Sequence, residues 1–151
     1  MGKPEIVSKE AFTVVGLKYR GKNENQEIPG LWQKLLPRFG ELRGMVKSEV
    51  SYGVMGCMDN DTGEFDYMAG YEYAGTDNLP EGMETWNVPE QKYAVFPATL
   101  PALMDVFKDI NERWLPESNL QRSDGIEFEL YDETFNPQDA SSLLYLYIPI
   151  A

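Results

Sequence analysis

Short runs of alternating apolar and polar residues recur along the chain, which is the pattern of strands that bury one face. In the clearest run, residues 126–131, isoleucine, phenylalanine and leucine alternate with Glu127, Glu129 and Tyr131. Because successive side chains of a strand point to opposite faces, the two glutamates and Tyr131 share one face. A carboxylate beside aromatic residues needs water, a partner or a cationic ligand, so this face is either solvated or a binding site. Alternation alone does not choose between Glu127 and Glu129.

Two other segments have the spacing of amphipathic helices and resemble each other. Ile28-Pro29 opens the first and Leu100-Pro101 opens the second, an offset of 72 residues. Proline is tolerated in the first turn of a helix, where its missing N–H has no partner to lose. The apolar stripes are Leu31, Trp32, Leu35, Leu36, Phe39 and Leu42 in the first segment, and Leu103, Phe107, Ile110 and Trp114 in the second. Pro37 predicts a break in the first helix near residues 33–36.

The predicted elements follow the same order in both halves of the chain, namely one strand, a helix and two strands. The strands are expected at 12–19, 52–58 and 65–73, then at 91–96, 126–131 and 143–150, with a further short strand at 83–88. A turn-rich connector, 74–82, joins the halves. Neither half covers both faces of its sheet alone. We therefore predict one α+β domain over residues 1–151, built from half-repeats of about 1–75 and 83–151.

Composition is that of a soluble globular domain and favours a cytoplasmic protein. The 151 residues are 42% hydrophobic and 13% aromatic, enough for one substantial core. No run approaches the roughly 18 apolar residues of a membrane span, and the N-terminus has no signal-peptide core, so no membrane partner is expected. Cys57 is the only cysteine, which excludes an internal disulfide and fits a reducing compartment. Without histidine to activate it, Cys57 is expected to be a core residue.

Charge and missing residue types exclude several classes of function. The net charge of −12, from 25 acidic and 13 basic residues, repels nucleic-acid phosphates and favours cationic small molecules. The absence of histidine excludes a Ser-His-Asp triad and histidine-bound metals, and one cysteine excludes zinc ribbons. Residues 59–66 resemble a calcium loop but misplace its glycine, so a hairpin turn is expected there. No metal and no cofactor are therefore predicted.

Several motifs, in order along the chain, carry a family resemblance. They are Ile28-Pro29 before Leu31-Trp32, Lys92-Tyr93-Ala94-Val95-Phe96, Trp114-Leu115-Pro116 with Ser118, Phe128-Glu129-Leu130-Tyr131 and Tyr147-Ile148-Pro149-Ile150. With the duplicated layout, they resemble the GyrI-like small-molecule-binding family, which includes effector-binding domains of AraC-type and MerR-type multidrug-responsive regulators. The resemblance implies two units side by side in an antiparallel sheet, with pseudo-twofold symmetry and helices flanking a ligand cleft. No residues remain for a helix-turn-helix, so a stand-alone domain is expected.

The resemblance also implies a ligand site, because the glutamate of its Phe-Glu-x-Tyr motif lies at or near the cleft. In this sequence that residue is Glu129, and it would complement a lipophilic cation. The aromatic candidates for the walls are Trp32, Tyr52, Trp86, Tyr93, Trp114, Tyr131 and Tyr147. Among them we favour Trp32 and Tyr93. The expected function is a non-catalytic protein that senses or sequesters amphipathic, cationic small molecules.

Two other classes of function stay open at this point. Some proteins of the family resemble hydrolases of strained electrophilic rings, for which Glu129 with Tyr93 or Tyr147 would supply acid-base chemistry. The family name refers to a gyrase inhibitor, so a gyrase or regulator partner is a further alternative. The sequence does not indicate an oligomeric state.

Overall fold

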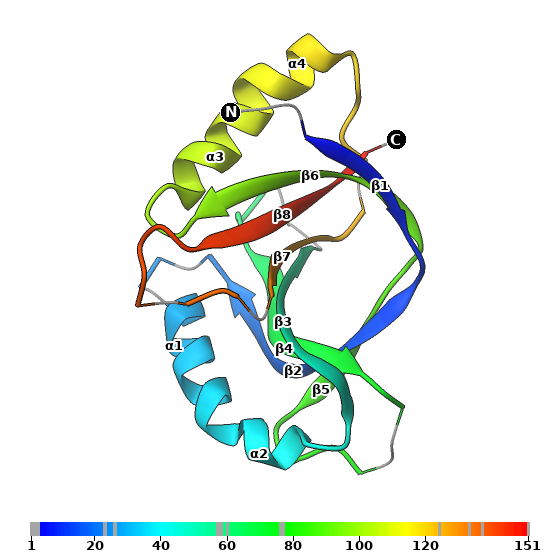
Figure 1. The fold of residues 1–151 in the computed structure, drawn as a ribbon, viewed down its shortest axis with the longest axis vertical. Coiled ribbons are helices and arrows are strands. Elements are labelled where there is room, and N and C mark those ends of the chain that lie inside the picture. The colour runs from blue at the N-terminus through cyan, green and yellow to red at the C-terminus, as the bar shows by residue number, and fades with distance from the viewer. Residues whose placement is uncertain are drawn as a thin grey trace.

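A computed structural model describes residues 4–22, 24–25, 27–56, 59, 61–75, 78–123, 125–132, 134–136 and 138–150, with Glu49 described by its backbone alone. Its strands are β1 (Glu5–Lys9), β2 (Phe12–Gly21), β3 (Val46–Gly56), β4 (Phe65–Tyr73), β5 (Glu84–Val88), β6 (Gln91–Thr99), β7 (Glu127–Tyr131) and β8 (Leu143–Ile150). All pair antiparallel in one curved sheet of order β1-β6-β8-β7-β3-β4-β2-β5 (Figure 1). The α+β class is confirmed.

The order of strands is the same when the sheet is followed inward from either end. β6 pairs with β8 and β8 with β7 in the second half, as β2 pairs with β4 and β4 with β3 in the first. β3 and β7 join the halves at the centre. The outermost strands are exchanged, because β1 pairs with β6 and β5 pairs with β2. Each half therefore completes the sheet of the other.

The largest differences from the predicted strands are at β1, β3 and β6. β1 was not predicted, because as an edge strand it has little buried surface, with Ile6 46% exposed. β3 begins at Val46, well before residue 52, and its register shifts between Val46 and Ser51. Such an irregularity interrupts the alternation from which the strand was predicted. β6 continues through Pro97 to Thr99. The missing N–H of Pro97 is tolerated because β1 pairs only with residues 91–95, which leaves β6 one neighbour at the proline.

Both helical segments change their winding next to a proline. The first comprises α1 (Glu27–Leu35), a 3₁₀ turn over Leu36–Arg38 that contains Pro37, and α2 (Phe39–Leu42), so the predicted break is confirmed. Leu36, predicted to be in the apolar stripe, is instead 53% exposed. A 3₁₀ turn has three residues per turn and rotates this side chain away from the helical face.

The second helical segment comprises α3 (Leu103–Asp109), a π-helical stretch over Ile110–Trp114 and α4 (Leu115–Ser118). Pro101 was predicted to lie in its first turn but precedes the helix. The reason is that residues 99–103 form tight turns, with the amide of Ala102 bound to the carbonyl of Thr99, before α3 begins. The four residues of the predicted stripe all pack into one core cluster.

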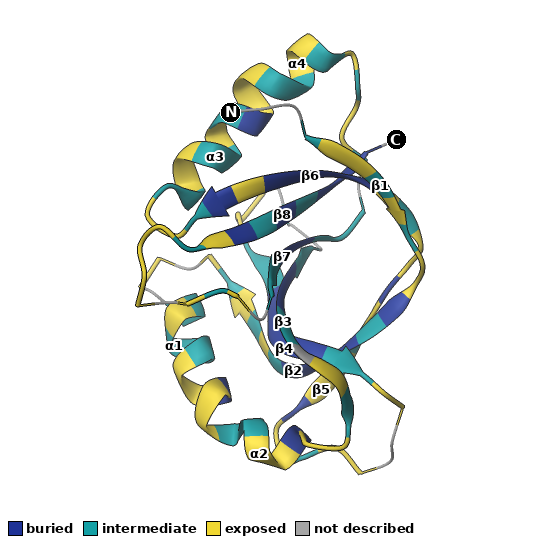
Figure 2. Ribbon diagram, in the orientation of Figure 1, coloured by how far each residue is buried: buried dark blue, intermediate teal, exposed yellow. Residues whose placement is uncertain are grey.

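The sheet has a different core on each face. Paired residues of antiparallel strands point to the same face. On one face, Leu35 and Leu42 pack against β2 and β4, while Ile110 packs against β6 and β8. The other face carries a core around Phe128. Figure 2 shows the resulting bands of buried residues along the central strands, with exposed outer surfaces on the helices.

Two further expectations concern loops and membranes. Residues 59–65 connect β3 to β4 through a turn in which the amide of Gly63 donates to the carbonyl of Asp59, although Cys57, Met58 and Asn60 lie outside the described residues. Over the described ranges, no group of three or more acidic or thiol side chains is arranged to hold a metal ion. Among the same residues, no helix is long and apolar enough to cross a membrane.

Candidate functional site

The Glu129 carboxylate lies at the centre of the sheet. Five residue pairs connect β3 to β7, and the middle pair is Gly53 with Glu129. The side chain points to the face that carries the helices, away from the core around Phe128, as the alternation in 126–131 predicted. Only 6% of Glu129 is exposed, so its carboxyl group is almost fully removed from water.

Three aromatic side chains complete a hydrogen-bonded group around this carboxylate. The hydroxyls of Tyr67 and Tyr131 each donate to Oε1 of Glu129 at 3.0 Å. Nε1 of Trp32 donates to the Tyr67 hydroxyl at 2.9 Å, and the Trp32 and Tyr131 rings meet edge-on at 5.5 Å between centroids. We call Trp32, Tyr67, Glu129 and Tyr131 the Glu129 cluster. Its members come from α1, β4 and β7, so both halves of the chain contribute.

The absence of a side chain at Gly53 makes room for the cluster. A Cβ atom at this position would lie 2.1 Å from the Tyr67 hydroxyl and 2.6 Å from Oε1 of Glu129. Both distances are far below ordinary van der Waals contact, so any larger residue would have to displace the buried hydroxyl or the carboxylate. Gly53 is therefore a requirement of the site's geometry.

Burial dominates the electrostatics of the cluster. Desolvation raises the pKa of Glu129, although the hydrogen bonds from Tyr67 and Tyr131 act in the opposite direction. Burial and the neighbouring carboxylate together hold the pKa values of both tyrosines above their usual range, so both remain hydrogen-bond donors at neutral pH. Among the described ion pairs, none involves Glu129. The carboxylate is thus buried with two neutral donors and without a cation.

Three of the predicted wall residues lie on the opposite face of the sheet. Tyr52, Tyr93 and Tyr147 surround Phe128, whose ring stacks on Tyr147 at 4.5 Å and meets Tyr93 edge-on at 5.2 Å between centroids. These side chains form the core of that face. The structure therefore does not bring them to the Glu129 carboxylate, because odd and even positions of β7 point in opposite directions.

The two remaining tryptophans also lie apart from the cluster. Trp86 packs against the core around Phe128 and carries the Lys18 ammonium 5.4 Å from its ring centroid. Trp114 lies in the π-helical stretch, where its ring meets Phe96 edge-on at 4.9 Å between centroids. Of the predicted site residues, only Trp32, Glu129 and Tyr131 belong to the Glu129 cluster.

Sequence reasoning did not single out Gly53 and Tyr67. Tyr67 lies in a correctly predicted strand, but nothing in its local pattern relates it to a carboxylate 62 residues further along the chain. The register β4-β3-β7 brings the two side chains together. A tyrosine buried at the centre of a strand was the available signal, since a buried phenol needs a hydrogen-bond partner.

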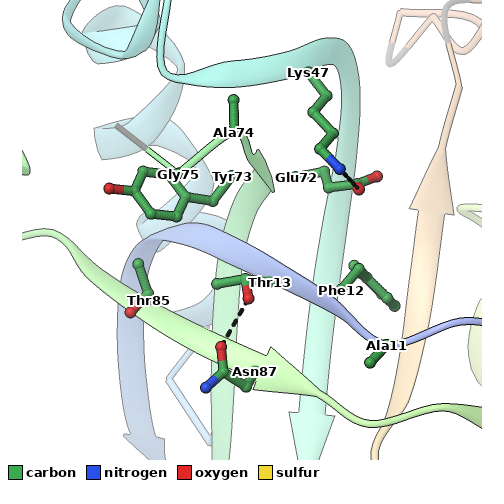
Figure 3. A pocket seen from close by; sticks show the side chains of 10 residues that line it. All are labelled: Ala11, Phe12, Thr13, Lys47, Glu72, Tyr73, Ala74, Gly75, Thr85 and Asn87. Carbon is green, nitrogen blue, oxygen red and sulfur yellow. Dashed lines mark hydrogen bonds and ion pairs between the residues drawn. The ribbon is translucent and has the colours of Figure 1, made fainter. Parts of the chain in front are cut away.

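A shallow hollow on the surface lies away from this cluster. Figure 3 shows that it is lined by residues of β2, β3, β4 and β5 and the loop after β4, with an ion pair between Lys47 and Glu72 and a hydrogen bond from Thr13 to Asn87. None of the residues lining it belongs to the Glu129 cluster. Its two charged residues, Lys47 and Glu72, are paired with each other and neither is buried, so we assign the candidate site to the cluster.

Comparison with known proteins identifies the family. Residues 5–150 match the integron-associated effector binding proteins, Cass2. The chain belongs to this family. The family match and the similar solved structures confirm the resemblance of the sequence to GyrI-like effector-binding domains. The transcriptional regulator BrlR of Pseudomonas aeruginosa is 42% identical over 148 residues, which cover 96% of this chain and 54% of BrlR. The Cass2 domain thus spans about half the length of the curated relative it matches.

Two solved structures share the fold of this Cass2 domain. SAV2435 bound to tetraphenylphosphonium has a TM-score of 0.76 at 18% identity, covering 99% of this chain and 94% of SAV2435. The integron cassette protein VCH_CASS2 of Vibrio cholerae has a TM-score of 0.70 at 19% identity, covering 99% and 96%. At these identities the comparisons establish the GyrI-like fold.

Proposed function

We propose that this chain is a binding domain for lipophilic monocations, with Glu129 as their charge partner. The observation that carries the proposal is the buried carboxylate, held by Tyr67 and Tyr131 and without an ion-pair partner among the described residues. A buried carboxylate without a cation is costly, and a cationic ligand would relieve that cost. Without a ligand, the Glu129 carboxylate therefore has no cation among the described residues to balance its charge.

The relatives support the same class of ligand. The neighbour SAV2435 was solved with tetraphenylphosphonium, a lipophilic monocation, and BrlR is a transcriptional regulator. The family itself is described as effector-binding. We infer that the domain reports or sequesters such a molecule, and that any regulatory output requires a partner or a further part of the protein.

The aromatic members of the cluster would supply the rest of the recognition. Trp32 and Tyr131 are partly exposed, whereas Tyr67 is buried, so the first two cover the carboxylate toward the surface. A ligand that displaces the Trp32 or Tyr131 ring would replace the lost aromatic contact with one of its own. Its positive charge would then contact the Glu129 carboxylate. Each aromatic face adds about 0.5–2 kcal/mol of attraction for a cation as the site dries.

The symmetry of the sheet supports a site on a central axis. We infer that the two half-repeats form a single domain and are related by a pseudo-twofold rotation through the Gly53–Glu129 pair. The matching strand order and the exchanged edge strands β1 and β5 support this. The helices α1 and α3, on the same face, would then flank a ligand cleft above Glu129.

The test compares a cation with a neutral molecule of similar shape. Methyltriphenylphosphonium and triphenylphosphine oxide would be titrated calorimetrically into the wild-type protein and into Glu129→Gln. We expect the variant to bind the cation roughly 10- to 100-fold more weakly, about 1.4–2.8 kcal/mol, and the neutral oxide to change less than about threefold. Glutamine keeps the size of the side chain but removes its charge.

Two controls make the result specific. Glu127→Gln, on the same face of β7 but paired with Arg122, should affect both ligands less than Glu129→Gln does. Thermal melting would establish that each variant is folded. Equal losses for the cation and the oxide in folded Glu129→Gln, or no loss for either, would reject Glu129 as the charge partner.

A further inference from the structure

The two oxygens of the Glu129 carboxylate are not equivalent. Both tyrosine hydroxyls donate to Oε1, at 3.0 Å each, whereas Oε2 accepts no hydrogen bond from the described residues. Across the described residues, no fully buried side-chain nitrogen or oxygen lacks a hydrogen-bond partner. Oε2 therefore cannot be fully buried. Glu129 as a whole remains 6% exposed.

The donors of the cluster are all committed to internal hydrogen bonds. The N–H of Trp32 is used by Tyr67, and the hydroxyl protons of Tyr67 and Tyr131 are used by Oε1. A phenol carries one proton and an indole carries one N–H, so none of the three has a second donor for a ligand. Within the cluster, Oε2 is therefore the charged acceptor left without a hydrogen bond, and the other three members have no spare donor to offer a ligand.

From this asymmetry we infer a chemical preference that rests on the proposed function: the site selects cations that carry an N–H group, such as protonated aromatic amines and amidines, over quaternary cations of the same shape. An N–H cation donates a charge-assisted hydrogen bond to Oε2. A quaternary cation has no N–H group to donate. When it displaces water from Oε2, that oxygen receives no hydrogen bond in return, and this weakens binding.

The experiment compares two dyes that differ at one atom. Acridine orange carries a proton on its ring nitrogen at pH 7.5, and its 10-methyl derivative carries a methyl group there, so both are monocations with the same ring system. Their dissociation constants for the unmodified chain would be measured by calorimetry. We expect the N–H dye to bind about tenfold more tightly, which corresponds to about 1.4 kcal/mol.

Two variants locate the preference on Oε2. In Glu129→Gln the carbonyl oxygen is expected to take the place of Oε1, where it accepts from both tyrosines, and the amide then presents N–H groups at the position of Oε2. The ratio of the two dissociation constants should fall from about ten to about one. Tyr131→Phe removes a donor to Oε1 but leaves Oε2 in place, so the ratio should persist while both affinities fall.

The outcomes separate this inference from the proposed function. Similar constants for the two dyes in the unmodified chain would overturn the N–H preference, while binding of both would leave the cation site standing. If neither dye nor methyltriphenylphosphonium binds, both the N–H preference and the proposed cation site are overturned. Because the decisive ratio is measured on the unmodified chain, a variant that fails to fold does not prevent the test.

Discussion

The two halves of the sheet meet at β3 and β7, where one half contributes a charged side chain and the other contributes a residue without a side chain. At the central residue pair, the second half supplies Glu129 and the first supplies the empty space of Gly53. The first half also supplies Trp32 and Tyr67, which form the hydrogen-bonded surroundings of the carboxylate. A fold with two similar halves therefore builds one asymmetric site, because the centre of the sheet has room for one acidic side chain.

The helical segments differ in the same way. Trp32 on α1 belongs to the Glu129 cluster, whereas Met104, its counterpart in the 72-residue echo, is 76% exposed on α3. The backbones also respond differently to a Leu-Pro pair, with a 3₁₀ turn at Pro37 and a π-helical stretch immediately before the turn that contains Pro116. Both helical segments pack on the same face of the sheet, and among the described residues α1 alone carries a side chain of the Glu129 cluster.

The largest expected effect comes from filling the empty position. Gly53→Ala places a methyl group against the Tyr67 hydroxyl and the Glu129 carboxylate, so it should lower the free energy of unfolding by about 1–3 kcal/mol. It should also weaken binding of methyltriphenylphosphonium by roughly 100-fold, about 2.8 kcal/mol. Urea unfolding and calorimetry would measure the two effects.

Gly30→Ala in α1 is the matched control, because a Cβ atom there meets no atom within 4 Å. It should raise the stability by about 0.5–1 kcal/mol, since alanine favours the helix. A Gly53→Ala protein as stable and as active in binding as wild type would contradict the crowding seen at the centre of the sheet.

The second prediction compares a buried tyrosine with a partly buried one. Tyr67→Phe removes the acceptor of the Trp32 N–H and one donor to Glu129, so it should cost about 1–3 kcal/mol of stability. Tyr145→Phe, on the third strand of the other half, should cost less than about 0.5 kcal/mol because Tyr145 is only partly buried. Equal costs in chemical denaturation would show that the two halves do not differ in the way proposed.

The third prediction uses the tryptophans as reporters. Ligand binding at the cluster should change the fluorescence of Trp32, so Trp32→Phe should remove most of the response and weaken binding by roughly threefold to tenfold. Trp114→Phe should keep the response, because Trp114 packs on Phe96 in the other half. Met104→Ala should change the affinity less than about twofold. A response that survives Trp32→Phe and disappears in Trp114→Phe would move the site to the second helix.

The smallest effect concerns pH. Burial raises the pKa of Glu129 in the folded chain, so folding favours its neutral form. The stability of wild type relative to Glu129→Gln should therefore be greatest below about pH 4 and should decline as pH rises through the raised pKa. The facing hydroxyls of Tyr67 and Tyr131 do not titrate in this range, because their pKa values are raised too. Glu127, on the same face of β7, forms an ion pair with Arg122.

The same titration gives a second readout. A quaternary cation binds the ionised carboxylate. Its affinity should therefore increase with pH over the interval in which the stability of wild type relative to Glu129→Gln declines. Denaturation and calorimetry at matched pH values would measure both curves. An affinity that is independent of pH between 4 and 8 would contradict ionisation of Glu129 as the step that accompanies binding.

The sequence by itself determined most of the elements, although not β1 or the start of β3, because most of them depend on local spacing. Alternation located β4 and β8 to the residue, and helical spacing and Pro37 located α1 and its break. The echo between the helices led us to expect a duplicated layout. The alternation in β7 also separated Glu129 from Phe128, because side-chain direction in a strand follows from the backbone alone. The Phe-Glu-x-Tyr motif then distinguished Glu129 from Glu127.

Only the tertiary structure decided which side chains share a site. Predicted aromatic residues were alike in type, yet Tyr52, Tyr93 and Tyr147 pack on one face of the sheet and Trp32 reaches the other. Tyr67 and Gly53 became visible through the register of β4, β3 and β7, which depends on pairings between residues distant in the chain. Local sequence does not specify such pairings, since the same alternating strand fits several neighbours until the whole core is packed.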